Sequence, residues 1–165
     1  MLRYTVSVVS LILIINGAQA EQQDVITTRQ MTLTFALQIA QKALEECNNA
    51  GYSVSAVVVD RAGITQVALR DTFASRFTLQ ISEEKANAAI MAGIPSGEFR
   101  KNRPDIRPEL NHVNGILIME GGLPIRAGGV LVGAIGVSGA PGGDKDEACA
   151  RKAINSVLDR LEFAD

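Results

Sequence analysis

The chain has few of the side chains that metal centres and nucleic-acid-binding surfaces require. It contains one histidine, His112, and two cysteines that lie far apart in the sequence, Cys47 and Cys149. A structural zinc site needs about four protein ligands, so these residues do not make one. Sixteen basic and eighteen acidic residues give a net charge of −2, whereas a nucleic-acid-binding domain carries a basic stripe. The composition therefore argues against a zinc domain and against nucleic acid as a partner.

The apolar stretch near the N-terminus is too short to span a bilayer comfortably. Residues 6–15 are apolar apart from two serines, and a membrane-spanning helix needs about 20 such residues. Arg3 precedes this stretch and Ala18-Gln19-Ala20 follows it, which is the pattern of a secretory signal. No cysteine follows Ala20, so a lipid anchor is not indicated. We expect residues 1–20 to be a signal peptide, and the mature protein to be periplasmic or secreted with no stable membrane anchor.

Cleavage after Ala20 leaves about 145 residues, the size of one ordinary domain. Residues 21–31 are polar, and we expect them to form a flexible N-terminal segment. The remainder contains no internal repeat, low-complexity tract or linker. We therefore expect residues 32–165 to form a single domain.

The two cysteines suit an exported protein, in which a disulfide persists. Both lie in helical patterns with apolar neighbours, where a small buried thiol packs well. If the first and last helices run antiparallel on one face of the sheet, Cys47 and Cys149 come to the same end of the pair. We expect free thiols, and a bridge between the two is the alternative.

Apolar periodicity and turn residues predict an alternation of helices and strand pairs. Thr32 is a good N-cap for the first helix, and Asp144 with Glu147 three residues later predicts a capping box for the last. The buried stripe expected on the first helix is Leu33, Leu37, Ala40, Leu44 and Cys47, and that on the last is Ala150, Ile154, Val157 and Leu161. The expected strands are 53–59, 64–69, 115–119, 123–126 and 130–137, and the middle helices are 78–92 and 97–102.

Two hairpins among these five strands make the sheet mainly antiparallel. Helices on both faces then give an α+β domain. We expect the first and last helices to pack side by side on one face.

Glycines are concentrated in residues 121–150, which hold nine of the fifteen in the chain. The backbone N–H groups of Gly121-Gly122 and 136–139, with the Ser138 hydroxyl, can bind an anion. The alternative is that these glycines permit tight sheet packing and subunit contact. No Gly-Lys-Ser/Thr ending follows, so the segment is not a P-loop. It is not a dinucleotide fingerprint either, because no such glycine pattern opens a helix after a parallel strand.

Two side chains outside this segment are candidate ligand contacts. Lys85, on the second helix, can attract a carboxylate, although a solvated surface lysine is the commoner case. His112 can ligate iron through a neutral imidazole, or simply hydrogen-bond a nearby main-chain group. A catalytic triad would need His112 to meet Ser138 with an acid in third place. We therefore expect no self-sufficient catalytic machinery.

Five short motifs occur in one order along nearly all of the mature chain. They are 57–63 (VVVDRAG), 85–86 (KA), 121–125 (GGLPI), 133–140 (GAIGVSGA) and 146–150 (DEACA). Through them, residues 33–161 resemble the GlcG/HbpS-like heme-binding family. Two departures stand out. Close relatives usually carry His-Thr immediately before the second helix, where this chain has Phe77-Thr78, and the Glu-x-x-Glu pattern associated with iron binding is missing.

The resemblance implies a profilin-like, three-layer α/β/α fold with a five-stranded, mainly antiparallel sheet, and a homo-oligomer. It implies an exported small-ligand-binding protein, with heme as the leading ligand. The alternatives are an accessory protein or enzyme for a small glycolate-like carboxylate, and a structural oligomer with a vestigial cleft. The residues expected to bind a heme or small anion are Lys85, His112 (as heme-iron ligand), Gly121, Gly122, Pro124, Ser138 and Gly139.

Overall fold

The computed structural model describes residues 24–162, so the expected signal peptide lies outside the described residues. The strands are β1 Ser55–Asp60, β2 Thr65–Arg70, β3 Gly122–Ala127 and β4 Val130–Ser138. The helices are α1 Leu33–Asn49, α2 Thr78–Ala92, α3 Ser96–Asn102, α4 Arg107–Leu110, α5 Gly143–Asn155 and α6 Leu158–Glu162. Within residues 24–162, none of the helices combines the length and apolar character needed to cross a membrane.

The four strands form one antiparallel sheet in the order β2-β1-β4-β3. The two predicted hairpins, β1–β2 and β3–β4, are confirmed, and β1 joins them by pairing with β4. The β-branched run in β1 is buried on both faces of the sheet, as expected for a central strand.

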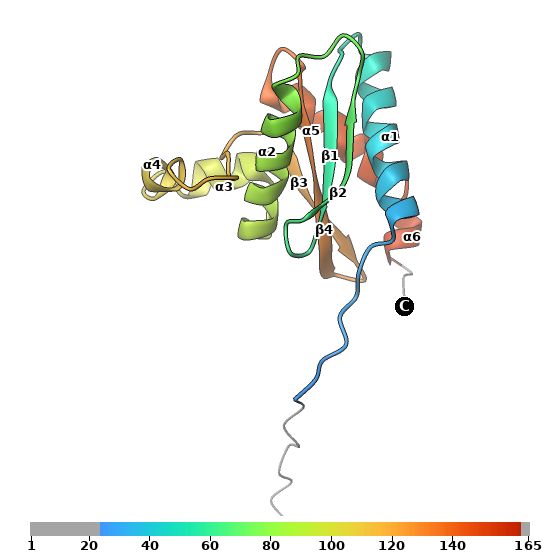
Figure 1. Cartoon of the computed structure of the whole chain (residues 1–165), viewed down its shortest axis with the longest axis vertical. Coiled ribbons are helices and arrows are strands. Elements are labelled where there is room, and N and C mark those ends of the chain that lie inside the picture. The colour runs from blue at the N-terminus through green and yellow to red at the C-terminus, as the bar shows by residue number, and fades with distance from the viewer. Residues whose placement is uncertain (1–23, 163–165) are drawn as a thin grey trace, which may run out of the picture.

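Helices cover both faces of this sheet (Figure 1). Alternate strand residues separate two apolar clusters, because successive side chains point to opposite faces. Val58 and Ile135 pack with α1 and α5, whereas Val57 and Ala134 pack with α2. The Lys152–Glu46 ion pair and the Arg160–Gln38 hydrogen bond show that the last helices run antiparallel to α1. The expectation that the first and last helices share one face is confirmed.

The expected fifth strand is wrong: the sheet has four strands. Residues 115–119 form no ladder, because their backbone groups have other partners. The Leu117 N–H donates to the Glu84 carbonyl on α2 at 3.1 Å, and the Met119 N–H turns back to the Leu117 carbonyl at 2.9 Å. A second hydrogen bond to α2, from Asn87 Nδ2 to the Gly115 carbonyl at 3.1 Å, holds the same segment there.

The predicted buried face of α1 and the predicted start of α5 need correction, whereas the stripe expected on the last helix does face the core. On α1, Leu33 is 62% exposed and the buried residues are Ala36, Ile39, Ala40, Ala43 and Cys47. The stripe is therefore rotated towards small residues, which let α1 approach the sheet and α5 closely. The expected capping box is absent from α5. This helix begins one residue earlier, with Gly142 as N-cap and no side-chain cap bond, and it is separated from α6 by Ser156 and Val157.

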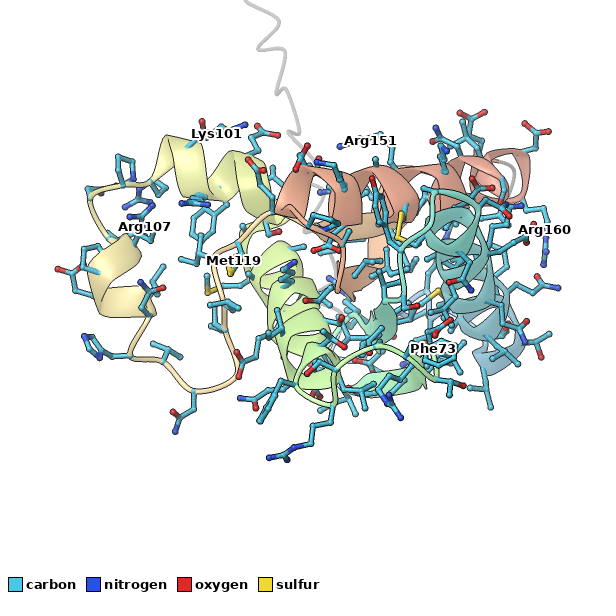
Figure 2. The ribbon with its side chains drawn as sticks, turned by 90° about the horizontal axis from the view of Figure 1, so that it is seen from above. Phe73, Lys101, Arg107, Met119, Arg151 and Arg160 are labelled. Carbon is cyan, nitrogen blue, oxygen red and sulfur yellow. A yellow bond between two sulfur atoms is a disulfide. The ribbon has the colours of Figure 1, made fainter. Side chains whose placement is uncertain are left out.

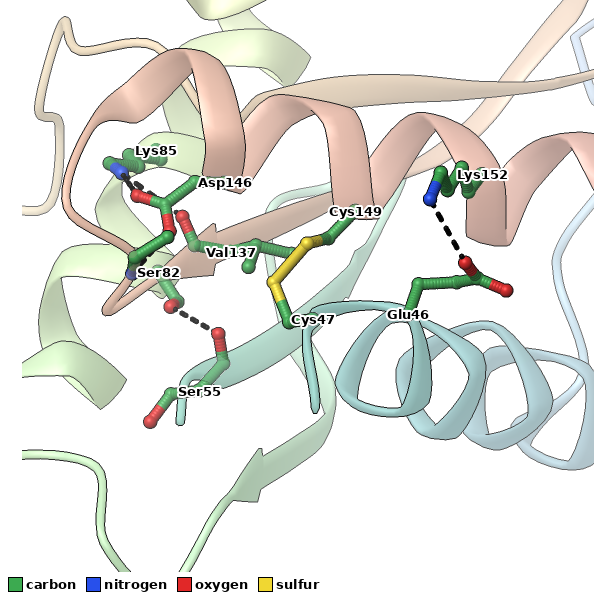
Figure 3. The surroundings of a disulfide bond; sticks show 10 residues. Glu46, Cys47, Ser55, Ser82, Lys85, Val137, Asp146, Cys149 and Lys152 are labelled. Atoms are coloured by element: carbon green, nitrogen blue, oxygen red, sulfur yellow. Dashed lines mark hydrogen bonds and ion pairs between the residues drawn. A yellow bond between two sulfur atoms is a disulfide. The ribbon is translucent and has the colours of Figure 1, made fainter. Parts of the chain in front are cut away.

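Cys47 and Cys149 form a disulfide, so the expectation of free thiols is wrong. Their Cα atoms lie 5.4 Å apart, within the range of about 4.4–6.8 Å that a bridge needs. The antiparallel packing of α1 against α5 brings them together at the end of the pair. Figure 3 shows the bridge between the two helices.

Residues 93–119 form an arm that carries α3 and α4 away from the sheet (Figure 1). At the opposite end of the domain, the chain enters α1 through Met31, whose side chain is buried. The Met31 carbonyl accepts a hydrogen bond from Gln66 Nε2 at 3.1 Å. The described part of the N-terminal segment is therefore tied to β2 before α1 begins.

Candidate functional site

The glycines of β3 and β4 lie directly beneath α2. Gly122 and Gly136 are opposite each other in the β3–β4 register. A Cβ on Gly122 would lie 2.1 Å from the Lys85 carbonyl oxygen, and one on Gly136 would lie 1.9 Å from the Ser82 carbonyl oxygen. These glycines let the backbone of α2 pack directly against the sheet. The space beside Gly122 and Gly136 is therefore filled by α2 and is not an open binding site.

Lys85 lies inside this packing, with its side chain only 1% exposed. Its ammonium group donates to Asp146 Oδ2 at 2.8 Å and to the Val137 carbonyl at 3.0 Å. The other carboxylate oxygen of Asp146 accepts the Ala140 N–H at 2.9 Å. Figure 3 shows Lys85 and Asp146 meeting beside Val137. Each charged group thus has its counter-ion and a backbone partner, as buried charges require.

Gly121 makes room for this ion pair. Its φ is +120°, and a Cβ there would lie 2.8 Å from Lys85 Nζ and 3.0 Å from Asp146 Cβ. Burial raises the pKa of the Asp146 carboxyl, and the Lys85 charge and hydrogen bond oppose that rise. Asp146 was not among the site residues expected from the sequence. The signal available was the place of Asp146 in the DEACA motif.

The remaining expected site residues, Pro124, Ser138 and Gly139, lie in or directly after β3 and β4. Pro124 pairs with Ala134 on the edge strand, and Ser138 is buried opposite Ser55. Gly139 has a φ of +135°, and a Cβ there would lie 2.7 Å from the Ser53 carbonyl oxygen. Ser138 and Gly139 thus lie at the end of the central strand β4, and Pro124 lies within β3. The structure brings Gly121 and Gly122, but not His112, into contact with Lys85.

His112 lies on the arm, in an exposed turn after α4. Its backbone N–H donates to the Glu109 carbonyl at 3.1 Å. The hollow beside this turn, which we call the arm hollow, has a volume of about 270 Å³. It is lined by Arg100, Arg107, Asn111, Leu117, Ile118 and Met119.

The arm hollow combines cationic and apolar surfaces. Within residues 24–162, the side chains of Arg100 and Arg107 have no hydrogen-bond or ion-pair partner. Figure 2 shows Arg107 on the arm, with Met119 between the arm and the body of the domain. The sequence pattern did not single out either arginine, since Arg100 lies in the expected helix 97–102 and Arg107 lies among other charged residues after it. No group of three or more possible metal ligands is present in the described part of the chain.

A second cleft, of about 420 Å³, lies between α3 and the start of α5. It contains four carboxylates and two basic side chains: Glu98, Glu120, Asp144, Glu147, Lys101 and Arg151. Glu120 pairs with Lys101, and Glu147 pairs with Arg151. Its charges are largely paired with each other, so it offers less to a ligand than the arm hollow does.

Known proteins share this fold and much of the sequence. The family model described as "Haem degrading protein HbpS-like" matches residues 31–155. The structure of a double mutant of HbpS from Streptomyces reticuli is 36% identical, with a TM-score of 0.77, and covers 86% of this chain and 96% of its own.

Two more distant structures have the same fold. Protein ORFY of Klebsiella pneumoniae is 26% identical, with a TM-score of 0.75, and covers 82% of this chain and 96% of its own. The PduOC:heme complex is 21% identical, with a TM-score of 0.69, and covers 78% of this chain and 95% of its own. No match was found among curated proteins. By the family match and the identity to HbpS, the chain belongs to the HbpS-like family.

Proposed function

We propose that this protein is an exported heme-binding protein and that the heme lies against the arm hollow, with His112 as the iron ligand. The observation that carries the proposal is a hollow, in an HbpS-like chain, with an apolar wall and two arginines that have no partner among the described residues. Asn111, the neighbour of the sole histidine, His112, also lines it. A structure of PduOC, a protein of the same fold, is a complex with heme.

The chemistry of the arm hollow fits a porphyrin. Heme has a flat apolar body and two carboxylates, and arginine recognises carboxylates through paired N–H groups. Arg100 and Arg107 supply the cations, and Leu117, Ile118 and Met119 supply apolar contact. We assign the carboxylates to these arginines rather than to Lys85, because Lys85 is buried against Asp146. When bound, heme supplies an iron centre whose reactivity depends on its axial ligand.

We propose binding without self-sufficient catalysis, because the described residues that line the arm hollow include no carboxylate to act as an acid or base there. The family model's description names haem degradation, so the test must separate the two activities. A Soret band that forms on titration and then persists under oxidant indicates binding. One that forms and bleaches faster than free hemin indicates degradation.

The test is a hemin titration of the mature chain, followed at the Soret band. His112→Ala should abolish the saturable shift for hemin and leave the affinity for iron-free protoporphyrin unchanged. Arg107→Gln should weaken the binding of both hemin and protoporphyrin. Arg151→Gln, in the second cleft, should leave the binding of both unchanged. If His112→Ala leaves the hemin spectrum unchanged, the ligand assignment is wrong. Saturable binding of glycolate without hemin binding would instead favour the small-carboxylate function.

Export and assembly belong to the same proposal. Cleavage near Ala20 would place the protein in the periplasm or outside the cell, where the Cys47–Cys149 bridge is favoured. We also propose a closed homo-oligomer, the usual form of soluble assemblies. Mass spectrometry of exported material should show a chain beginning at Glu21, and light scattering at micromolar concentration should show a particle larger than one chain.

A further inference from the structure

A third cleft lies at the end of the domain opposite the arm. It is bounded by the segment before α1, which we call the strap (residues 28–32), by the start of α1, by the ends of β3 and β4, and by α6. Its volume is about 470 Å³, and pockets of roughly 300–1,000 Å³ are typical of small-molecule sites. Figure 2 shows Arg160, from this end, on the far side of the molecule from Arg107. The lining residues are Thr28, Arg29, Gln30, Met31, Thr32, Phe35, Ala127, Val132, Arg160 and Leu161.

The floor of this strap cleft is apolar and ordered by packing. Met31, Ala127, Val132 and Leu161 are all buried members of the main core cluster. The Gly128 N–H donates to the Leu161 carbonyl at 2.8 Å, which fixes the β3–β4 turn against α6. The floor is therefore built from four separate segments of the chain that pack together.

Among residues 24–162, the rim of the strap cleft has arginines and no carboxylate. Arg160 and Arg29 line it, although acids outnumber bases in the chain. The Arg160 guanidinium stacks over the Phe35 ring at 4.6 Å and donates to Gln38 Oε1 at 2.7 Å. These two contacts hold the guanidinium in place without neutralising it, because neither partner is charged.

The helix that starts at the strap cleft, α1, adds to the positive charge at the rim. α1 has no acidic residue in its first turn, and its N-cap, Thr32, and Phe35 both line the cleft. The N-terminus of a helix carries partial positive charge. The Arg160 guanidinium and this helix end thus lie beside an apolar floor.

We propose that the strap cleft binds a small carboxylate or sulfonate with an apolar body. The apolar part would lie on the floor formed by Met31, Val132 and Leu161, and the anionic head would face Arg160. This site is separate from the arm hollow and does not depend on heme binding there. A second copy of this chain is the competing occupant, which the experiment must distinguish.

The experiment uses the mature chain and the probe 1-anilinonaphthalene-8-sulfonate, with decanoate as competitor. Wild type should show saturable fluorescence that decanoate displaces. Arg160→Gln should weaken probe binding about tenfold, as expected for the loss of a charge-assisted contact. Gln30→Glu, which adds a carboxylate to the exposed rim, should also weaken it. Arg151→Gln, an exposed arginine of the second cleft, should have no effect, and all variants should melt as wild type does.

Methionine methyl resonances locate the bound probe. Met31 lies in the floor of the strap cleft, Met119 lines the arm hollow, and Met91 is on α2 away from both linings. The sulfonate should shift the methyl resonance of Met31 and leave those of Met91 and Met119 unchanged. Hemin should instead broaden the methyl resonance of Met119. The two proposals therefore fail independently. Unchanged probe affinity in Arg160→Gln, or a shift at Met119 alone, overturns the strap-cleft proposal. So does a dimer that excludes the probe and dissociates on this substitution, which would assign the cleft to a second copy.

Discussion

Lys85 Nζ and Asp146 Oδ2 lie 2.8 Å apart although they belong to helices on opposite faces of the sheet. The two side chains meet beyond the sheet end, where Gly121 has no side chain to separate them. The ion pair therefore connects the two helical layers directly. Both groups are almost completely removed from water.

Removing one member of this pair should be far more damaging than removing both. We expect Lys85→Met and Asp146→Asn each to lower the free energy of unfolding by about 3–5 kcal/mol, because each leaves a buried polar partner unmatched. The double variant should lose much less than the sum, since the unmatched charge is gone. Urea denaturation of the four proteins measures the coupling. Additive losses would mean that the two groups do not interact in solution.

Substitution of a sheet glycine and of a turn glycine should distinguish two costs in stability. One arises from loss of close packing and the other from an unfavourable backbone conformation. Gly136→Ala would place a Cβ 1.9 Å from the Ser82 carbonyl oxygen. It should lower stability by about 3 kcal/mol or more, because α2 must move. Gly129→Ala, where φ is +80° and no atom lies within 4 Å, should cost only about 1–2 kcal/mol, from the left-handed conformation. Thermal unfolding of both variants checks this order, and equal losses would contradict it.

Breaking the disulfide should destabilise the domain without changing its fold. The bridge joins residues 102 positions apart, and restraint of so long a loop in the unfolded chain is worth about 2–5 kcal/mol. The Cys47→Ala/Cys149→Ala variant should therefore unfold at lower denaturant concentration. Wild type in strong reductant is the matched control and should behave similarly. Two reactive thiols in unfolded, unreduced wild type would show that the bridge had not formed.

The carboxyl group of Asp71, in the loop before α2, should titrate at an unusually low pH. The Phe73 N–H donates to Asp71 Oδ1 at 2.9 Å and lowers the pKa of that carboxyl. A lowered native pKa means that this stabilisation is present at neutral pH. It is lost as the pH falls through the native pKa. The Phe73 amide resonance should report a midpoint below that of an aspartate in a short peptide, and Asp71→Asn should remove the transition. A midpoint at or above the peptide value would refute this.

The sequence predicted the parts of this fold that local patterns determine. α2 was expected at 78–92 and both hairpins were expected, because glycine caps, turn residues and β-branched runs act over a few positions. The contacts between segments were harder to predict. Residues 115–119 are apolar like a strand, but their backbone pairs with α2 instead.

The same limit applies to the candidate site. Lys85 was singled out, but its partner Asp146 is 61 residues away. Apart from its place in the DEACA motif, nothing local distinguishes Asp146 from the neighbouring acids of the same helix start. The same limit applies to Cys47 and Cys149, because the sequence pattern around each cysteine is the same for two buried thiols and for a disulfide. Whether His112 meets a ligand depends on how the arm is placed, which periodicity does not encode.

The disulfide also divides the chain into a closed ring, from Cys47 to Cys149, and two tails outside it. The ring contains the whole sheet, α2 and the arm. In the arm, trypsin can cut after Arg100 and Lys101, whereas Arg103 and Arg107 precede prolines and resist it. A protease that cuts the arm once opens the ring but releases nothing. The nicked protein gains one water in mass and separates into two pieces only after reduction.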